Sequence, residues 1–564
     1  MQTAWPASPC ILAAVIHLLL HRKSRMKLSS IALSLLFSAG AHSAFAAPPK
    51  PFLWENATVY FLVTDRFANG DKSNDLAYGR KADAAPLRGF MGGDFKGLTA
   101  KIKSGYFDDL GVDVIWTTPP VEQVHAGTDE GTGKSYGFHG YWARDFTAMD
   151  ANLGTEKDFR DFVEAAHARG IRVLLDVVMN HTGPVTVADP AWPEGWVRTE
   201  PQCSYKDVAT TVSCTLVKNL PDFRTESDAP VELPEALAAK WKSEGRYERE
   251  TKELDDFFAR TGYPRAPRYY LMKWHADWVR KFGIDGFRAD TAKHVEPGVW
   301  AELRKVALAA HDEWKSLNPK QVLGDGRFFM VGEVYNYNIA HGLDFDMGGG
   351  AKANFYANGF DGLINFGMVH DAKGDYESLF GKYATQLAGP LKGYTVMNYM
   401  DSHDDGNPFD PARQKPFETA NKLLLAPGAA QIYYGDEISR RLDVADAKGD
   451  AKLRSFMNWG DLKANAKIRA HWAKLGKFRQ QHPAIGAGEH KKLADAPYTF
   501  SRVRGDDKVV VALDVKTVQP VDIAVGGVFA DGAKVRDAYS GLSYTVKNGA
   551  VHTNGKNATI LLAQ

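Results

Sequence analysis

The chain has 564 residues, of which 44% are hydrophobic and 24% are charged. This composition is typical of a globular protein with a large core and argues against intrinsic disorder. The 69 basic and 68 acidic residues give a net charge of +1, which offers no electrostatic basis for binding nucleic acid or an anionic membrane, so a neutral partner is expected.

The first 46 residues are predicted to be an export signal. Met26-Lys-Leu opens a basic start, residues 31–37 form an apolar run too short to span a bilayer, and Ala44-Phe-Ala46 is a small-residue cleavage site. We expect cleavage after Ala46 and export to the periplasm or the medium. Residues 1–25 are interpreted as a mis-assigned upstream start, with a longer basic region ahead of the signal as the alternative.

Strand-like and helix-like segments alternate through the next four hundred or so residues, which predicts a parallel α/β architecture. The eight predicted strands are residues 58–65, 112–119, 171–178, 286–290, 328–335, 363–368, 394–401 and 429–437. The fourth is so short that only its place in the series supports it. Residues 155–170 are predicted to be a helix, because their apolar residues recur at helical spacing and Thr155 with Asp158 forms a capping box.

Residues 182–265 interrupt this alternation and are predicted to form an inserted subdomain. The segment is rich in Pro, Trp, Thr and Glu, and a structureless loop of this length is improbable in a compact domain. It contains Cys203 and Cys214, an even pair in a protein predicted to be exported. A disulfide between them is therefore expected, with two free thiols as the alternative.

The pattern changes again after residue 483. Residues 498–503, 509–514 and 521–525 are short alternating runs separated by Gly and Asp, which predicts an antiparallel β-domain over residues 484–564. The barrel-type segments are then residues 47–181 and 266–483.

Four of the predicted strands end in a polar motif. These motifs are Asp176-Val-Val-Met-Asn-His181, Gly286-Phe-Arg-Ala-Asp-Thr-Ala-Lys-His294, Val331-Gly-Glu-Val-Tyr335 and Tyr399-Met-Asp-Ser-His-Asp404. Each begins as an apolar run and ends in carboxylates, histidines or amides. Polar residues at the carboxyl ends of successive parallel strands form the working face of a (β/α)8 barrel.

In order, spacing and context these motifs resemble the signature regions of the α-amylase family of retaining glycoside hydrolases. The resemblance implies a (β/α)8 TIM barrel with an inserted domain B after the third strand and a C-terminal antiparallel β-domain. It also implies that Asp290 is the nucleophile, that Glu333 is the general acid/base with a raised pKa, and that Asp404 is a third carboxylate gripping sugar hydroxyls. Three unrelated surface acids are the alternative, since the chain holds 68.

The resemblance also implies a set of substrate-binding residues. His181 and His403 would surround the glucose bound at the cleavage point, and Tyr141 would stack on it. Arg288 lies on the same strand face as Asp290 and would keep that carboxylate ionised. Lys293 and His294 would lie on the leaving-group side, as in α-1,4-acting members, while Trp142 is expected to pack in the core. One departure is Ser402, which stands where many members have Asn.

Two calcium sites are suggested. In the first, Asn180, Asp222 and the carbonyl of His294 match family ligands that join barrel to insert. The second has the ligand-rich loop Asn69-Gly-Asp71-Lys-Ser-Asn74-Asp75 with Gly92-Gly-Asp94. Oxygen-bearing side chains between glycine turns are typical of a Ca²⁺ loop, and a similar loop occurs in cyclodextrin glucanotransferases. A metal-free Asn/Asp turn is the alternative for this loop.

Three functions are consistent with these motifs to different degrees. The first is an exported, monomeric, endo-acting α-amylase that hydrolyses internal α-1,4 bonds of starch or maltodextrins with retention of configuration. The second is a transglycosylase or a maltodextrin- or cyclodextrin-acting hydrolase on the same fold, which the loop at Asn69 favours and the lack of two further C-terminal domains disfavours. The third, a barrel without catalysis that serves as an accessory subunit, is disfavoured because all three acids are present.

Overall fold

The structure is a computed structural model that describes residues 52–129 and 131–564. These residues belong to one compact unit of the chain. The predicted signal region, residues 1–46, lies outside them. Within the described residues, no helix is both long and apolar enough to cross a membrane.

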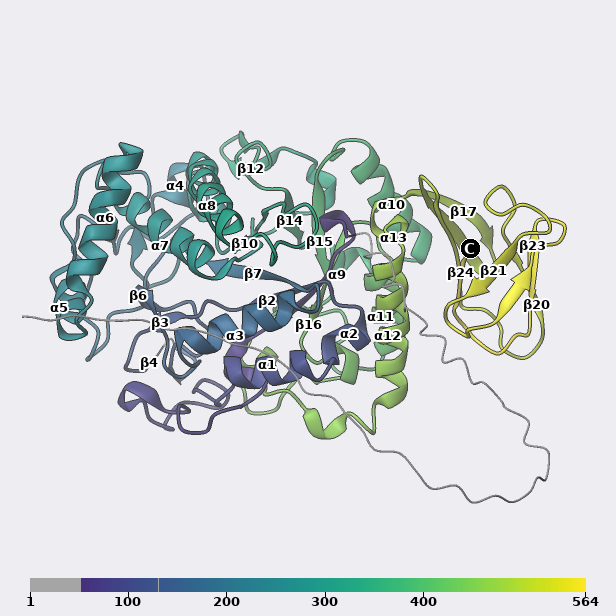
Figure 1. The fold of residues 1–564 in the computed structure, drawn as a ribbon, viewed down its shortest axis with the longest axis horizontal. Coiled ribbons are helices and arrows are strands. Elements are labelled where there is room, and N and C mark those ends of the chain that lie inside the picture. The colour runs from purple at the N-terminus through teal and green to yellow at the C-terminus, as the bar shows by residue number, and fades with distance from the viewer. Residues whose placement is uncertain (1–51, 130) are drawn as a thin grey trace, which may run out of the picture. The chain divides into compact units, whose positions relative to one another are not determined.

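The centre of the fold is a closed barrel of eight parallel strands in the order β1-β16-β15-β14-β11-β10-β7-β2 (Figure 1). Its strands are β1 (Thr58–Leu62), β2 (Val114–Thr117), β7 (Arg172–Val177), β10 (Gly286–Ala289), β11 (Phe329–Gly332), β14 (Gly362–Asn365), β15 (Thr395–Tyr399) and β16 (Ala429–Tyr433). Every residue in them is buried, which explains why they form continuous apolar runs in the sequence. The barrel and all eight predicted strands are confirmed. The predicted ranges extend further at their carboxyl ends, because the polar tips belong to the loops.

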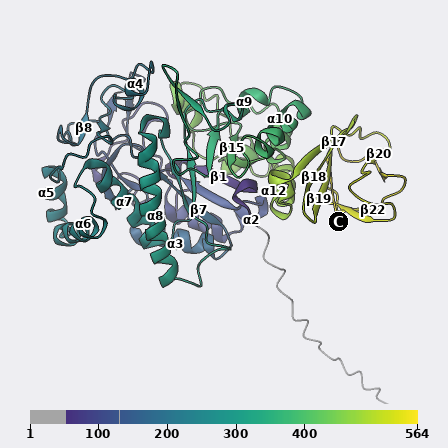
Figure 2. The same ribbon diagram turned by 90° about the horizontal axis from the view of Figure 1, so that it is seen from above.

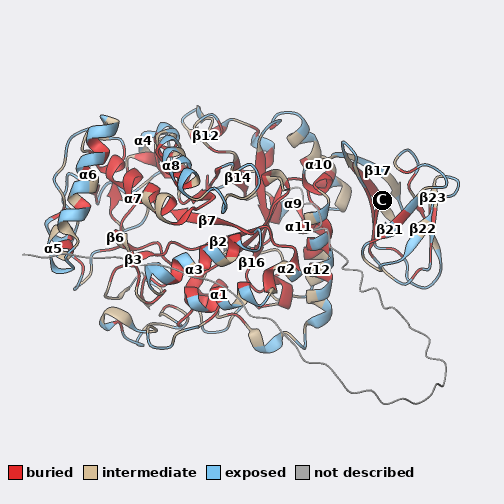
Figure 3. Ribbon diagram, in the orientation of Figure 1, coloured by how far each residue is buried: buried red, intermediate tan, exposed pale blue. Residues whose placement is uncertain are grey.

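Helices surround the barrel, and each has a buried side and an exposed side (Figure 3). The larger ones are α1 (Phe95–Lys103), α3 (Glu156–His167), α7 (Pro267–Phe282), α8 (Pro297–Leu317), α10 (Tyr376–Ala388), α11 (Pro416–Leu424) and α12 (Ala466–Gln481). The predicted capping box is present at α3, where the Thr155 side chain accepts from the Asp158 N–H and Asp158 accepts from the Thr155 N–H. This helix buries Phe159, Phe162 and Val163.

The segment between β7 and α7 is folded rather than a bare loop. It contains β8 (Val197–Arg198) paired with β9 (Asp222–Phe223), and the helices α4 (Ala209–Val212), α5 (Glu235–Ser243) and α6 (Tyr247–Thr261). Trp196 anchors it on the barrel by stacking on Trp274 of α7, with ring centroids 6.0 Å apart. Cys203 and Cys214 form the expected disulfide.

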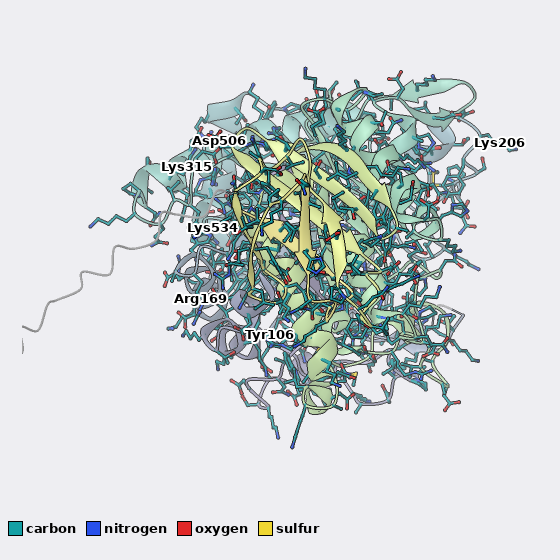
Figure 4. The ribbon with its side chains drawn as sticks, turned by 90° about the vertical axis from the view of Figure 1, so that its right-hand side faces the viewer. Tyr106, Arg169, Lys206, Lys315, Asp506 and Lys534 are labelled. Atoms are coloured by element: carbon teal, nitrogen blue, oxygen red, sulfur yellow. A yellow bond between two sulfur atoms is a disulfide. The ribbon has the colours of Figure 1, made fainter. Side chains whose placement is uncertain are left out.

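The C-terminal part is antiparallel, as expected. A six-stranded sheet has the order β17-β18-β19-β24-β21-β22, and β20 pairs with β23. The strands are β17 (Glu489–Asp495), β18 (Tyr498–Arg504), β19 (Asp507–Leu513), β20 (Val521–Ala524), β21 (Lys534–Asp537), β22 (Ser543–Thr545), β23 (Ala550–Thr553) and β24 (Ile560–Ala563). Figure 2 shows these strands beside α12, and Figure 4 views them face on, with Lys534 labelled.

Buried contacts join this sheet to the barrel helices. The Arg502 guanidinium donates to the Leu425 carbonyl at 3.0 Å, and the rings of Phe380 and Phe500 lie 5.4 Å apart. Residues 484–487 form a short helix, α13 (Ala484–Ala487), rather than the start of the β-domain. The domain limits given above otherwise stay predictions.

Candidate active site

One guanidinium brings together the acids of three neighbouring strands. Arg288 Nη1 lies 2.6 Å from Asp290 Oδ1 and 3.0 Å from Asp176 Oδ1, and Nη2 lies 2.9 Å from Glu333 Oε1. Strands β7, β10 and β11 are adjacent, and Asp176, Arg288 and Val331 share one level of the sheet. Residues 290 and 333 therefore meet at the carboxyl end of the barrel, on the two terminal nitrogens of one side chain.

Glu333 is buried in an environment that favours its protonated form. Its side chain is 10% exposed, and burial raises its pKa well above the ordinary value for glutamate. The charges of Asp290 and Asp404 raise that pKa further, while Arg288 opposes them. Glu333 Oε2 accepts from the Thr291 N–H at 2.7 Å. Thr291 has φ 45°, an uncommon conformation for a β-branched residue that directs this N–H into the site.

Asp404 differs from the other two predicted catalytic acids in its exposure. Its side chain is 43% exposed, against 8% for Asp290. The Ser402 hydroxyl donates to Asp404 Oδ1 at 3.0 Å, so the departure from the family motif supplies a hydrogen bond to this carboxylate. His403 Nε2 lies 3.7 Å from Asp404 Oδ2. Asp404 is thus free to meet a ligand while its neighbours orient it.

The predicted sugar-binding residues lie around the same acids. The rings of Tyr141 and His403 are stacked with centroids 5.2 Å apart, and His181 Nε2 is 3.1 Å from the Tyr141 carbonyl oxygen. Burial lowers the pKa of His403 to about 4 and lowers that of His181. Both imidazoles are therefore neutral at pH 7 and can exchange hydrogen bonds with uncharged hydroxyls.

Asp176 belongs to this centre, although its position at the start of a strand-end motif predicted no role for it. Besides Arg288, it accepts hydrogen bonds from the Tyr141 hydroxyl at 2.8 Å and from Trp116 Nε1 at 3.0 Å. Burial raises its pKa to about 7, and the charge of Arg288 partly offsets that rise. A lone aspartate inside a strand of apolar residues was the available signal, because a buried carboxylate requires partners.

Lys293 and His294 lie where the insert meets the barrel. They belong to the 3₁₀ turn η4 (Ala292–His294) that follows β10. His294 Nδ1 is 3.0 Å from the carbonyl oxygen of Thr211 in the disulfide-closed loop, and burial lowers the pKa of His294 to about 4. Lys293 Nζ lies 5.4 Å from the ring centroid of Tyr205 and 5.5 Å from that of Phe345.

The first suggested metal site has a donor set that fits a hard cation. The Phe223 N–H donates to the Asn180 carbonyl at 2.7 Å, which ties the insert to the end of β7. Asp222 Oδ1 is buried and has no hydrogen-bond partner among the described residues, and burial raises the pKa of Asp222 to about 7. An unpaired buried carboxylate oxygen is unfavourable, and a divalent cation with oxygen ligands would satisfy it.

The second suggested site fits in part. The Oδ1 atoms of Asn69 and Asn74 are buried without a hydrogen-bond partner in the described part of the chain, and Asn69 Nδ2 donates to Asp75 Oδ1 at 2.8 Å. A Cβ at Gly92 would lie 2.6 Å from Asp75 Oδ1, so Gly92 borders the same point.

Two of the predicted ligands of this loop have other partners. Asp71 pairs with Lys96 at the surface, and Asp94 caps α1 and accepts from the N–H groups of Gly70 and Asp71. Across residues 52–129 and 131–564, no group of three or more His, Cys, Asp or Glu side chains is arranged to hold a metal. Amide and carbonyl oxygens would therefore supply much of the coordination at either site.

Comparison with known proteins identifies the family. Residues 61–477 match the alpha amylase catalytic domain. The chain belongs to the alpha-amylase family. The periplasmic alpha-amylase of Escherichia coli K12 is 38% identical over 524 residues, covering 82% of this chain and 72% of the relative. The cyclomaltodextrin glucanotransferase of Geobacillus stearothermophilus is 28% identical over 471 residues, covering 81% of this chain and 59% of the relative.

A solved structure shares the fold of this alpha-amylase family member. CldA, described as the first cyclomaltodextrin glucanotransferase with a three-domain ABC distribution, has a TM-score of 0.64 at 21% identity. The match covers 90% of this chain and 98% of that chain. Since a glucanotransferase can have three domains, the number of C-terminal domains does not separate the first two functions compared above. The family match and the identity to the E. coli alpha-amylase together indicate a glycoside hydrolase and argue against a barrel that serves only as an accessory subunit.

Proposed function

We propose that the protein is an exported α-amylase that hydrolyses internal α-1,4-glucosidic bonds of starch and maltodextrins with retention of configuration. The observation that carries the proposal is the pair of carboxylates, Asp290 and Glu333, held by the two terminal nitrogens of Arg288. Retaining glycosidases use two carboxyl groups in this way, one as a nucleophile and one as an acid and base.

In the first step, Glu333 donates its proton to the glycosidic oxygen while Asp290 attacks the anomeric carbon. The bond to the leaving sugar breaks, and a covalent glycosyl ester forms on Asp290. In the second step, the ionised Glu333 takes a proton from water, whose oxygen attacks the same carbon and releases Asp290. Arg288 holds the nucleophile in place through its contact with Asp290 Oδ1, and burial keeps the acid protonated.

The remaining site residues position the sugar. Asp404, His403 and His181 are proposed to bind hydroxyls of the ring at the cleavage point, and Tyr141 to pack against its apolar face. Lys293 and His294 are proposed to contact the leaving-group side of the glucan, between the disulfide-closed loop and residue Phe345.

Calcium is proposed as a structural ion. Asn180, Asp222 and the carbonyl of His294 would hold one ion between barrel and insert. Asn69, Asn74, Asp75 and Gly92 would hold a second, with Asp71 and Asp94 ordering that loop. A bound cation would supply the charge that neutralises the buried Asp222 and would help to hold the insert against the end of β7.

A cyclodextrin-acting hydrolase or a transglycosylase is the second candidate. The glucanotransferase relatives and the loop at Asn69 favour it. Export to the periplasm or the medium is supported by the disulfide and by the name of the E. coli relative. A monomer is proposed.

Product analysis on soluble starch, with the anomeric configuration followed by NMR, tests the proposal. We expect linear maltooligosaccharides that appear first as α-anomers, and no turnover by the Asp290→Asn variant while its thermal unfolding stays cooperative. Cyclic products would favour the second candidate. Near wild-type turnover by Asp290→Asn would overturn the catalytic assignment.

A further inference from the structure

A cavity of about 730 Å³ lies between the barrel helices and the C-terminal β-domain. The residues that line it include Tyr376, Phe417, Glu418, Asn421, His471 and Tyr539. None of them belongs to the catalytic centre. We propose that this cavity is a second binding site for an α-glucan chain, an inference that rests on the proposed function.

Aromatic rings from three helices and from the turn after β21 form its wall. Phe417, at the start of α11, is 44% exposed, although large apolar side chains are usually covered. Its ring lies 4.9 Å from that of His471 on α12, which in turn lies 5.6 Å from the ring of Tyr539. Tyr376 of α10 and Tyr539 are each partly exposed. Exposed ring faces suit the apolar faces of pyranose sugars.

A chain of hydrogen bonds holds this wall across the junction. His471 Nδ1 is 2.9 Å from the Tyr539 hydroxyl, and His471 Nε2 is 3.1 Å from Asn421 Oδ1. Asn421 Nδ2 donates to the Tyr376 hydroxyl at 3.5 Å. Because both imidazole nitrogens are engaged, the barrel and the C-terminal domain present their rings in a set arrangement before any ligand binds.

The charges around the cavity favour a neutral, hydroxyl-rich ligand. Lys373 and Lys422 stand against Asp375, Glu418 and Asp514, and Lys422 Nζ pairs with Glu418 Oε1 at 2.6 Å. Mixed signs give no preference for an anion or a cation. Carboxylate and amide oxygens beside aromatic rings can bind sugar hydroxyls, and the volume lies in the range typical of ligand sites.

The element order places the cavity toward the same end of the barrel as the catalytic acids. Helices α10 and α11 begin after β14 and β15, so Tyr376 and Phe417 lie toward the end of the barrel where the strands finish and the catalytic acids stand. A site there would retain a long glucan on the protein between cleavage events, whereas a short oligosaccharide would use the catalytic cleft alone.

The test measures adsorption to insoluble starch in the Asp290→Asn background, which prevents digestion of the support. Phe417→Ala and Tyr539→Ala should each raise the dissociation constant about three- to tenfold, the loss of one ring contact. Tyr539→Phe keeps the ring and loses only the hydrogen bond to His471, so it should weaken adsorption less than Tyr539→Ala does. Leu317→Ala, which truncates a 73% exposed side chain at the end of α8, is the matched surface control.

In the active enzyme, Phe417→Ala should leave kcat/KM on a short chromogenic maltoside within about twofold of wild type, since the short substrate does not reach the second site. Adsorption of Phe417→Ala and Tyr539→Ala within the range of Leu317→Ala would overturn the proposal, as would an equal loss in Tyr539→Phe. If Tyr539→Ala fails to fold, Phe417→Ala provides the test, because the Phe417 side chain is exposed. An inactive wild type on the short maltoside would instead overturn the proposed function and leave the adsorption result readable.

Discussion

The shared guanidinium of Arg288 gives the sharpest prediction about catalysis. Arg288→Lys keeps a positive charge between the acids but replaces two terminal nitrogens by one. A single ammonium cannot match the planar fork that contacts Asp290 on one side and Glu333 on the other. We therefore expect the variant to lose at least one charge-assisted hydrogen bond at the reacting carboxylates.

The magnitude follows from that contact. A hydrogen bond to a charged group contributes about 1.5–3 kcal/mol, and each 1.36 kcal/mol of activation free energy is tenfold in rate. Arg288→Lys should thus lower kcat/KM roughly 10- to 150-fold. Arg288→Met should also lower the free energy of unfolding by about 3–5 kcal/mol, because it leaves buried carboxylates without a counter-charge.

Initial rates on soluble starch and thermal unfolding measure both effects. Arg304→Lys is the matched control, since Arg304 donates to Asp361 at 2.6 Å at the opposite end of the barrel. It should change stability without a comparable loss of kcat/KM. If Arg288→Lys keeps wild-type kcat/KM, or loses no more than Arg304→Lys, the proposed role of the guanidinium is wrong.

Three further predictions concern protons, metal and the disulfide. Activity needs a protonated Glu333, and burial raises the pKa of this carboxyl well above 4.5. We therefore expect kcat/KM to persist well above pH 4.5 and to fall only as pH rises through the raised pKa of Glu333. A decline in kcat/KM that begins near pH 4.5 would contradict the assignment of Glu333 as the acid. In metal-free protein, the raised pKa of Asp222, about 7, gives stability that is complete below its unfolded value and lost as pH rises through 7. A chelator should therefore lower the melting temperature more at pH 8 than at pH 5. Equal shifts at the two pH values, or no shift at either, would contradict the proposed calcium site at Asp222. Replacing Cys203 and Cys214 by Ser should cost about 3 kcal/mol of unfolding free energy through loop-closure entropy, as read from denaturant titration with the reduced wild type as control; an unchanged midpoint would show that the bridge adds no stability.

The sequence determined the barrel because burial leaves a periodic signature. Strands buried on both faces form continuous apolar runs, so even the short β10 was found from its place in the series. The predicted catalytic acids came from the resemblance of the strand-end motifs to the signature regions of the α-amylase family, and their positions are consistent with that role. Asp290 and Glu333 each follow an apolar run directly, and a carboxylate at such a position must face either a partner or a substrate.

Only the tertiary structure decided which side chains meet. Arg288 could be paired with Asp290 from the sequence, since they lie on one strand face, but its contacts with Asp176 and Glu333 depend on the packing of three strands. In the loop at Asn69, the sequence predicted Asp71 as a metal ligand, but in the structure Asp71 forms an ion pair with Lys96. The contact between His471 and Tyr539 joins a barrel helix to a separate sheet. Local sequence patterns indicate which residues are buried and whether a segment is a helix or a strand. Contacts between side chains far apart in the sequence depend on how the elements pack, and no local pattern contains that information.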